Sequence, residues 1–292
     1  MDPGTARPPA LDADWLGVCR RAGEGLRAIM RDNPTSNERV RETGLTGEGG
    51  DQTLVIDQDA EDVVFAELER LHDGGLRFCA VSEERGTVDF GDDAVRVVID
   101  PIDGSLNAKR GLTHHALSIA VADGATMADV AFGYVLDLGP GEEWWARRGQ
   151  GAFLDGAPLH PPGERRTEDG RLEVVAIESA SPRAIALAID DLVPSVRRIR
   201  AIGSIAISLC QVAAARVDGM ASLWNCRGVD AAAAQFIVRE SGGLVSFVAM
   251  DDPLGAPLST EAHSPVVAAR TPEALAAMAR VPVTPPDRPS GG

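Results

Sequence analysis

Several features that would place this 292-residue chain in a specialised class are scarce or missing. Its four cysteines lie far apart and form no C-x-x-C pair, which argues against a disulfide framework and a zinc site and favours reduced thiols. No apolar run reaches the roughly 18–20 residues that a membrane helix needs. The N-terminus has proline and aspartate where a signal peptide needs a basic end and an apolar stretch, so we expect a cytoplasmic protein.

Positive charge is also in short supply. Lysine and arginine number 28 against 44 acidic residues, which gives a formal net charge of −16. Sequence-independent binding to nucleic acid, or binding to an anionic membrane, needs a basic surface, so we expect neither partner. Aromatic residues make up only 4% of the chain, so its core must consist mainly of alanine, valine, leucine and isoleucine.

Hydrophobic periodicity predicts an α+β part at residues 12–160 and an α/β part at 165–280, separated by a segment rich in proline and charge at 155–171. Residues 1–11 and 281–292 are expected to be poorly ordered tails, and 33–51 a polar, glycine-rich loop. The predicted helices cover residues 12–31, 58–71, 182–191, 204–215, 229–241 and 272–278. The predicted strands cover 76–81, 94–99, 116–121, 129–136, 142–147, 152–154, 172–177, 196–199, 220–223, 244–247 and 266–269.

The most informative stretch reads VVIDPIDGS, at residues 97–105. A buried strand leads into a turn with two carboxylates, Asp100 and Asp103, which can face one point at the end of the strand. Pro101 ends the strand ladder, and Gly104 lets a ligand approach the backbone closely. A helical turn beginning at Ser105 would offer N–H groups to an anion. Two carboxylates beside an anion site make electrostatic sense when Mg²⁺ lies between them, although Asp-Pro-x-Asp-Gly is also ordinary turn chemistry.

Two further clusters carry carboxylates that are able to join this site. Glu83 and Glu84 follow a short predicted strand, where the alternative is a solvated acidic loop. Asp230 lies in the first turn of a helix that begins with GVDAAAA, where the alternative is a capping acid that favours the helix dipole. The alanines make this helix thin and allow close packing against another element.

The motifs SEE (82–84), DPIDGS (100–105) and GVDAAAA (228–234) followed by ESGG (240–243) resemble, in this order, the inositol monophosphatase family. This family belongs to the lithium-sensitive, magnesium-dependent phosphatases, which include some fructose-1,6-bisphosphatases. VSEE and DPIDGSLN are most similar to its bacterial and archaeal broad-specificity branch. The resemblance implies a layered α-β-α-β-α sandwich and a small phosphorylated substrate, and it favours a homodimer.

The resemblance also implies two or three Mg²⁺ ions and the residues that hold them. Glu83, Asp100 and the backbone carbonyl of Ile102 would hold the first ion. Asp100, Asp103 and Asp230 would hold the second, and a third ion would lie near Glu83 and the substrate. Water activated in this way would attack the phosphorus in line with the ester oxygen.

The remaining site residues follow from the same resemblance. Glu83 and the hydroxyl of Ser105, which stands where the family usually has threonine, would orient and deprotonate the attacking water. Asp57 matches an aspartate that supports this relay, or else it caps the second predicted helix. The substrate would lie against Asp103, Gly104, Ser105, Gly203, Ser204 and Asp230.

One departure leaves the substrate open. Inositol-specific relatives carry an acidic residue about seven positions before the last metal aspartate, and Leu223 occupies that position here. Inositol 1-phosphate therefore competes with fructose 1,6-bisphosphate, histidinol phosphate, 3′-phosphoadenosine nucleotides and an intermediate of a specialised pathway. A non-catalytic regulatory binding protein on the same fold is a second class of function, disfavoured because every motif carboxylate is present.

Other conspicuous residues carry less weight. Arg200 and Arg227 either contact a second phosphate or lie at a surface or interface, and Lys109 with Arg110 would draw an anionic substrate toward an acidic cleft. His114 and His115 are adjacent on a predicted strand, so they point to opposite faces and would not share a zinc ion. Trp144 and Trp145 are interpreted as core residues with a dimer contact, in preference to a stacking platform.

Overall fold

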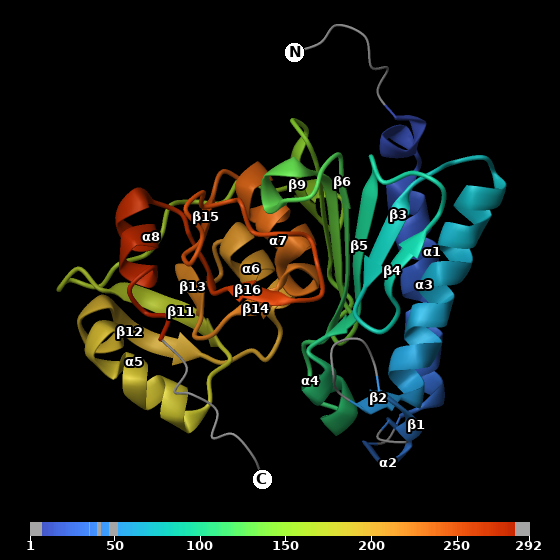
Figure 1. Ribbon diagram of the computed structural model, residues 1–292. Coiled ribbons are helices and arrows are strands. Elements are labelled where there is room, and N and C mark those ends of the chain that lie inside the picture. Colours follow the sequence, from blue (N-terminus) through green and yellow to red (C-terminus); the bar gives the residue numbers. More distant parts are fainter. Residues whose placement is uncertain (1–7, 35, 40–41, 47–51, 284–292) are drawn as a thin grey trace, which may run out of the picture.

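The computed structural model describes residues 8–34, 36–39, 42–46 and 52–283, and it arranges them in five alternating layers of helix and sheet (Figure 1). Two helices cover one face of an eight-stranded sheet, two more lie between that sheet and a five-stranded sheet, and a last pair covers the far face. The predicted α-β-α-β-α sandwich is confirmed. No helix in these described ranges is both long and apolar enough to pass through a bilayer.

The eight-stranded sheet has the order β10-β9-β8-β7-β6-β5-β3-β4, and all its neighbours are antiparallel except β3 and β5. Its central strands are buried on both faces because helices cover both, which explains their nearly continuous apolar sequences. The strands are β3 (Cys79–Ser82), β4 (Gly86–Asp89), β5 (Arg96–Asp103), β6 (Ala116–Ala122), β7 (Val130–Asp137), β8 (Glu143–Arg147), β9 (Gly151–Leu154) and β10 (Ala157–Pro158).

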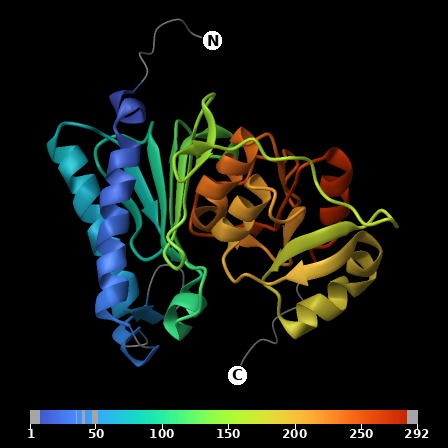
Figure 2. The same cartoon turned by 180° about the vertical axis from the view of Figure 1, so that it is seen from behind.

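The outer face of this sheet is covered by α1 (Trp15–Asp32) and α3 (Val55–Asp73), which run side by side (Figure 2). Asp14 begins α1 by accepting a hydrogen bond from the Gly17 N–H at 3.0 Å. Trp15 is fully buried, and its ring packs edge-on against Phe78 at a centroid distance of 6.0 Å. The few large aromatic side chains are therefore concentrated where helices and sheet meet.

The central layer consists of α6 (Ile205–Ala213) and α7 (Gly228–Glu240), with α7 packed against β5, β6 and β7. A β-carbon added at Gly133 of β7 would lie 2.7 Å from the carbonyl oxygen of Ala233. Only a helix with small side chains comes this close to a sheet, as the alanine run predicted. The same hydrophobic cluster continues from α6 and α7 to the second sheet, so the proposed parts 12–160 and 165–280 share this layer.

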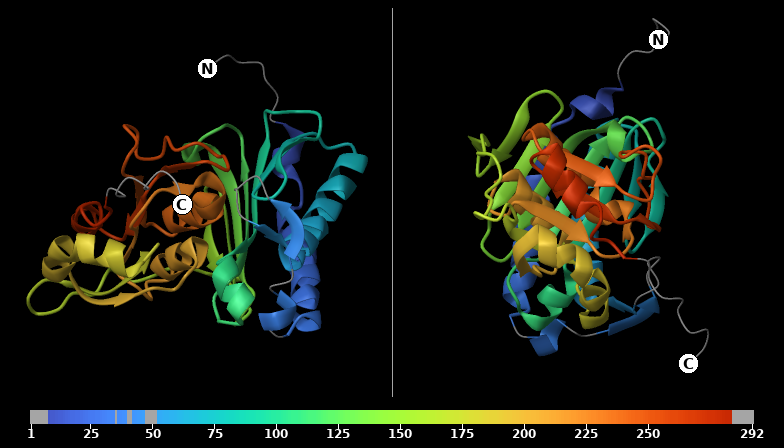
Figure 3. Two further views of the ribbon diagram at one scale, coloured as in Figure 1. Left: turned by 60° about the horizontal axis from the view of Figure 1, so that its bottom comes forward. Right: turned by 90° about the vertical axis from the view of Figure 1, so that its left-hand side faces the viewer.

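The second sheet has the order β12-β11-β13-β17-β15, in which β11 is parallel to both its neighbours. Its outer face is covered by α5 (Pro182–Ser195) and α8 (Pro272–Met278), as the left part of Figure 3 shows. The strands are β11 (Leu172–Glu178), β12 (Val196–Arg200), β13 (Gly219–Ser222), β15 (Leu244–Phe247) and β17 (Val266–Ala269).

The prediction that residues 33–51 form a loop is wrong in part. It contains the short helix α2 (Ser36–Arg39) and the strand β1 (Glu42–Thr46), which pairs with β2 (Gln52–Leu54). A two-stranded ribbon of polar sequence gives no apolar alternation, so the pattern could not reveal it. Other small elements were also missed: β4, β10, the paired β14 (Cys226–Arg227) and β16 (Ala262–Ser264), η1 (Pro9–Asp12) and η2 (Met127–Asp129). The helical turn predicted at Ser105 is α4 (Ser105–Arg110).

The expected tails also differ at their inner ends. Ala10 and Leu11 are buried, and the carbonyl of Ala10 accepts a hydrogen bond from the Trp15 indole at 2.7 Å. At the other end Val281 is buried, and the N–H of Val283 donates to the Leu223 carbonyl at 2.9 Å. Residues 1–7 and 284–292 lie outside the described residues. All four cysteines are buried and free, as their spacing predicted.

Candidate active site

The two aspartates of the DPIDGS motif both lie within β5, which runs four residues further than predicted. Asp100 pairs with Ser118 and Asp103 with Ala116, so β5 contains one extra residue between them and bulges. Pro101 lies in this bulge, where its missing N–H leaves no ladder bond unmade. Asp100 is 1% exposed and Asp103 is 8% exposed. The bulge therefore keeps both carboxylates buried at the end of the strand, instead of in an exposed turn.

Gly104 joins this strand to α4, and its conformation admits no side chain. Its φ of 88° is in the left-handed region, and a β-carbon there would lie 2.9 Å from the Gly203 carbonyl oxygen and 3.1 Å from that of His114. A helical turn begins at Ser105, as expected, and the Ser105 hydroxyl donates to the Ile102 carbonyl at 3.3 Å. The DPIDGS motif therefore approaches the predicted substrate segment Gly203-Ser204 at Gly104, where no side chain separates the two backbones.

Glu83 and Asp230 come from opposite sides of the site and are joined by Arg227. Glu83 follows β3, and Asp230 lies in the first turn of α7. The Arg227 guanidinium donates from Nη1 to Glu83 Oε1 and from Nε to Asp230 Oδ1, the latter at 3.0 Å. Arg227 is therefore held inside the carboxylate cluster. The structure does not place Arg227 on an open surface, and a contact with a second phosphate stays a prediction.

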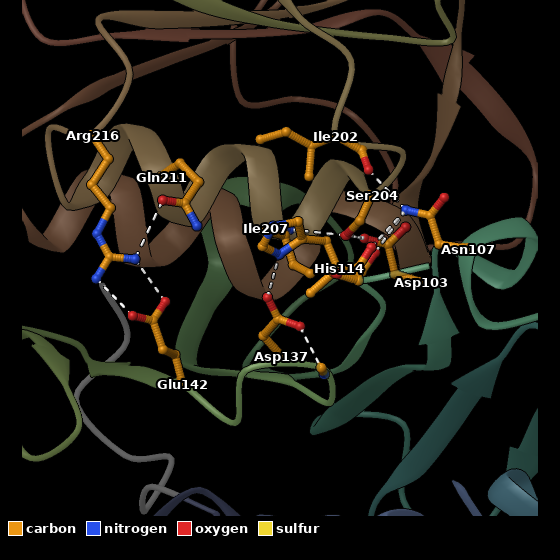
Figure 4. A network of polar contacts seen from close by, with 12 residues as sticks. Asp103, Asn107, His114, Asp137, Glu142, Ile202, Ser204, Ile207, Gln211 and Arg216 are labelled. Atoms are coloured by element: carbon orange, nitrogen blue, oxygen red, sulfur yellow. Dashed lines mark hydrogen bonds and ion pairs between the residues drawn. The ribbon is translucent and has the colours of Figure 1, made fainter. Parts of the chain in front are cut away.

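Ser204 connects the second half of the chain to the cluster (Figure 4). Its hydroxyl donates to Asp103 Oδ2, and the Ala206 N–H donates to the same oxygen at 2.7 Å. The same hydroxyl caps α6 by accepting from the Ile207 N–H at 3.1 Å. The predicted substrate segment Gly203-Ser204 is therefore attached directly to a predicted metal ligand.

Two buried polar residues that hold this segment were missed. Glu178, at the end of β11, accepts hydrogen bonds from the N–H groups of Ile202 (3.0 Å) and Gly203 (2.9 Å). Asn107 of α4 donates to the carbonyls of Ile202 at 2.8 Å and His114 at 2.9 Å. A carboxylate at the end of a predicted strand was the available signal for Glu178, whereas nothing in the sequence marks Asn107.

The carboxylates raise one another's proton affinity. Burial raises the pKa of Asp100 well above its usual value, and the negative charges of Glu83, Asp103 and Asp230 raise it further, while Arg227 lowers it. Burial raises the pKa of Asp103 to about 7, against the hydrogen bond from Ser204. Four carboxylates therefore share one region of low dielectric, with a single guanidinium among them.

This donor set fits a hard divalent cation by its chemistry. Buried carboxylate oxygens in excess over basic groups are the ligands that Mg²⁺ prefers, and the cation would relieve their mutual repulsion. Within the described residues, however, no group of three or more histidine, cysteine, aspartate or glutamate side chains is already arranged around a metal position. The guanidinium of Arg227 instead pairs with oxygens of both Glu83 and Asp230.

A small pocket beside the carboxylate cluster is lined by Asp57, the remaining predicted catalytic residue. Asp57 and Ser105 line it together with Glu83, Glu84, Pro101 and Ile102. Asp57 is buried and lies within α3, which begins at Val55. The alternative that Asp57 is the N-cap of this helix is therefore wrong. All the predicted catalytic residues thus border one space.

Comparison with known proteins matches this chain to the model of the "Inositol monophosphatase family" over residues 15–282. The chain belongs to the inositol monophosphatase family. The predicted resemblance is thereby confirmed over nearly the whole sequence.

Individual relatives agree with this membership. The "Fructose-1,6-bisphosphatase/inositol-1-monophosphatase" of Methanothermobacter thermautotrophicus is 32% identical over 243 residues, which cover 80% of this chain and 84% of the relative. The "Nus factor SuhB" of Escherichia coli is 33% identical over 235 residues, covering 79% and 84%. The crystal structure of the extragenic suppressor protein suhB from Bartonella henselae, at 23% identity, covers 92% of this chain and 98% of its own with a TM-score of 0.73 and shares the fold.

For a member of the inositol monophosphatase family, the position of Leu223 is informative. Leu223 is fully buried between the second sheet and the outer helices, as an apolar side chain at this position requires. Arg200 is exposed on β12, where its guanidinium donates to the Ile199 carbonyl at 2.8 Å. Lys109 and Arg110 end α4, and Arg110 is exposed.

The histidine and tryptophan pairs have separate roles. His114 Nδ1 lies 2.7 Å from the buried Asp137 carboxylate, as Figure 4 shows. His115 is buried, with 5% of its surface exposed. Trp144 is fully buried, and Trp145 stacks on Phe153 at a centroid distance of 4.0 Å. The predicted core role is confirmed for Trp144, Trp145 is partly buried against the core, and the dimer contact stays a prediction.

Proposed function

We propose that this chain is a Mg²⁺-dependent phosphatase that hydrolyses the phosphate monoester of a small polyol or sugar. The observation that carries the proposal is the convergence of Glu83, Asp100, Asp103 and Asp230 from three elements on one buried region. Structural ion pairs seldom leave such an excess of buried carboxylates, because their mutual repulsion is costly without cations. The family membership supports phosphatase chemistry.

In this proposal the cluster holds two or three Mg²⁺ ions. Glu83, Asp100 and the Ile102 carbonyl would hold the first ion, Asp100, Asp103 and Asp230 the second, and a weaker third would lie near Glu83. Bound Mg²⁺ lowers the pKa of coordinated water and neutralises phosphate charge.

The chain's own residues then position the reactants. Glu83 and the Ser105 hydroxyl orient the attacking water, and Glu83 accepts its proton, with Asp57 supporting this relay from the same pocket. Gly104, Ser105, Gly203 and Ser204 line the phosphate and the rest of the substrate. Water adds to phosphorus as the ester P–O bond breaks, and the alcohol leaves with a proton. No covalent nucleophile is required.

The substrate proposed is inositol monophosphate or a sugar phosphate. Relatives named for both fructose-1,6-bisphosphatase and inositol-1-monophosphatase activities support this range, and the absence of an acidic residue at Leu223 argues against strict selection of inositol. Histidinol phosphate and a specialised-pathway intermediate are the remaining alternatives. A cytoplasmic, lithium-sensitive homodimer is part of the same proposal.

A second candidate function is a regulatory binding protein, because relatives 31–33% identical are named Nus factor SuhB. The complete carboxylate set favours the enzyme, since a protein that acts only through contacts has no need of four crowded carboxylates, three of them buried. The two functions make different demands on Mg²⁺, and this difference provides the test.

The test is phosphate release, with and without Mg²⁺ and with added lithium, from inositol 1-phosphate, fructose 1,6-bisphosphate, histidinol phosphate and 3′-phosphoadenosine 5′-phosphate. Asp100→Asn is the inactivating variant, and Asp123→Asn, which removes a surface ion pair with Arg148, is its control. We expect Mg²⁺-dependent release from at least one ester, retained by the control and lost by Asp100→Asn. Activity retained by Asp100→Asn, or no metal-dependent release at all, would refute the proposal.

A further inference from the structure

The guanidinium of Arg227 bonds a carboxylate oxygen of Asp230, which is a proposed metal ligand. Asp230 Oδ2 accepts a hydrogen bond from the Arg227 backbone N–H at 2.8 Å. Asp230 Oδ1 accepts from Arg227 Nε at 3.0 Å and lies 2.8 Å from Nη2. Both oxygens are therefore engaged by the same residue, one by its backbone and one by its side chain.

The same guanidinium also reaches the other wall of the site. Its Nη1 donates to Glu83 Oε1, a residue 144 positions away in the sequence. One side chain thereby links β3 to the first turn of α7. A divalent cation binds carboxylate oxygens at about 2.0–2.1 Å, so it would occupy the space that this cation now fills.

We propose that Arg227 is a resident counter-cation of the carboxylate cluster, and that divalent-cation binding must displace its guanidinium from Glu83 and Asp230. The inference deepens the proposed function and rests on it, because it concerns the ions that the phosphatase would bind. Arg227 in this role acts on the metal ligands Glu83 and Asp230 and has no part in binding substrate.

The charge balance explains why the two cations exclude each other. Without metal, buried carboxylates that lack a partner are costly, and Arg227 supplies the compensating positive charge. With divalent cations bound, the positive charges would repel a guanidinium only a few ångströms away in a medium of low dielectric. Each cation therefore weakens the binding of the other.

The backbone allows this exchange without unfolding. Arg227 directly precedes α7, and its side chain is 25% exposed, so the guanidinium has a route toward solvent. The hydrogen bond from its backbone N–H to Asp230 does not depend on the side chain and keeps one oxygen of Asp230 in place. Displacement thus frees Oδ1 and leaves the carboxylate oriented.

The test is a calorimetric titration of metal-free protein with MgCl₂, using the wild type, Arg227→Gln and Arg227→Lys. The control is Arg216→Gln, which removes a surface ion pair with Glu142. We expect Arg227→Gln to bind Mg²⁺ at least about tenfold more tightly than the wild type, because a competing charge pair of more than about 1.4 kcal/mol is gone. Arg227→Lys should lie between them, since a lysine cannot span both carboxylates, and the control should match the wild type.

Two readouts other than activity accompany the titration. In EDTA, Arg227→Gln should melt at a lower temperature than the wild type, and Mg²⁺ should raise its melting temperature further than it raises that of the wild type. In the wild type, the ¹⁵Nε resonance of Arg227, assigned by its absence from Arg227→Lys, should shift as Mg²⁺ saturates the protein. This last measurement follows the wild type itself, and Arg227→Lys serves only to assign the resonance.

Unchanged or weaker Mg²⁺ binding by Arg227→Gln would overturn the inference. An Arg227 resonance that stays in place while Mg²⁺ saturates the wild type would overturn it as well. If the wild type binds no Mg²⁺ in the calorimeter, the proposed function itself fails, and the two failures are thereby distinguished.

Discussion

The buried carboxylate of Glu178 holds the backbone N–H of Gly203 at 2.9 Å and thereby ties the end of β11 to the candidate active site. The same carboxylate accepts from the Ile202 N–H and, at 2.6 Å, from the Ser208 hydroxyl. The oxygens of Glu178 thus orient residues 202–204, and Ser204 of this segment donates a hydrogen bond to Asp103. The second sheet contributes to the site through the side chain of Glu178.

Replacing Glu178 with glutamine should therefore loosen this segment. The amide group of the introduced glutamine turns a donor toward an N–H that needs an acceptor, at a cost of about 1–3 kcal/mol in the free energy of unfolding. We expect this loss in urea denaturation, together with a higher KM. Glu173→Gln, on the same strand but partly exposed, is the matched control. Equal stabilities of the two variants would contradict the role assigned to Glu178.

Gly104→Ala should disrupt the site by crowding as well as by strain. Gly111 also has a positive φ (68°) but has nothing within 4 Å of an added β-carbon, so Gly111→Ala measures the conformational cost alone, about 1 kcal/mol. At Gly104 the β-carbon would meet the Gly203 carbonyl oxygen at 2.9 Å, and we expect an additional loss of about 1–3 kcal/mol and of phosphatase activity. Thermal denaturation and phosphate release measure the two effects, and similar results for the two variants would refute this explanation.

Gly133→Ala tests the close contact between β7 and α7. The added methyl group would lie 2.7 Å from the Ala233 carbonyl oxygen, so the helix must move, at a cost of about 1–3 kcal/mol. Because α7 also carries Asp230, the shift should weaken Mg²⁺ binding. Gly163→Ala, in an open loop, should change neither stability nor Mg²⁺ affinity. Calorimetry and denaturation check both expectations. Unaltered Mg²⁺ binding in Gly133→Ala would show that the contact between β7 and α7 does not position Asp230.

His115 should make the protein sensitive to acid. Burial lowers the pKa of His115 from 6.5 to about 4, so the unfolded state takes up its proton first as the pH falls. The stability associated with the neutral ring is complete above about pH 6.5 and is lost as the pH falls toward 4. Between pH 7 and 4.5 this loss amounts to about 2 kcal/mol.

The measurement is urea denaturation at several pH values for the wild type and His115→Gln. The variant should lose about 2 kcal/mol less than the wild type over the same interval, whatever its stability at pH 7. Because other groups titrate in both proteins, only the difference between the two profiles is diagnostic. Parallel profiles would show that His115 is protonated equally in the folded and unfolded states.

Local pattern carried most of the information about elements and about the identity of the site residues. The apolar runs that became β6 and β7 could be recognised because burial on both faces leaves no polar positions in a strand. Asp100, Asp103 and Asp230 could be selected because their short motifs combine carboxylates with turn and helix-start residues. Family membership followed from three such motifs in order, with no knowledge of distances.

Tertiary structure decided how these residues meet. The β5 bulge, the close approach of Gly104 to Gly203, and the ion pair between Arg227 and Glu83 all depend on layers that are assembled from distant parts of the chain. A sequence motif specifies chemistry within a few residues, whereas the partner of a buried charge is set by which element packs opposite it. For this reason Asp100 could be proposed as a ligand from the sequence, whereas Arg227 became interpretable only once the fold placed it between two carboxylates.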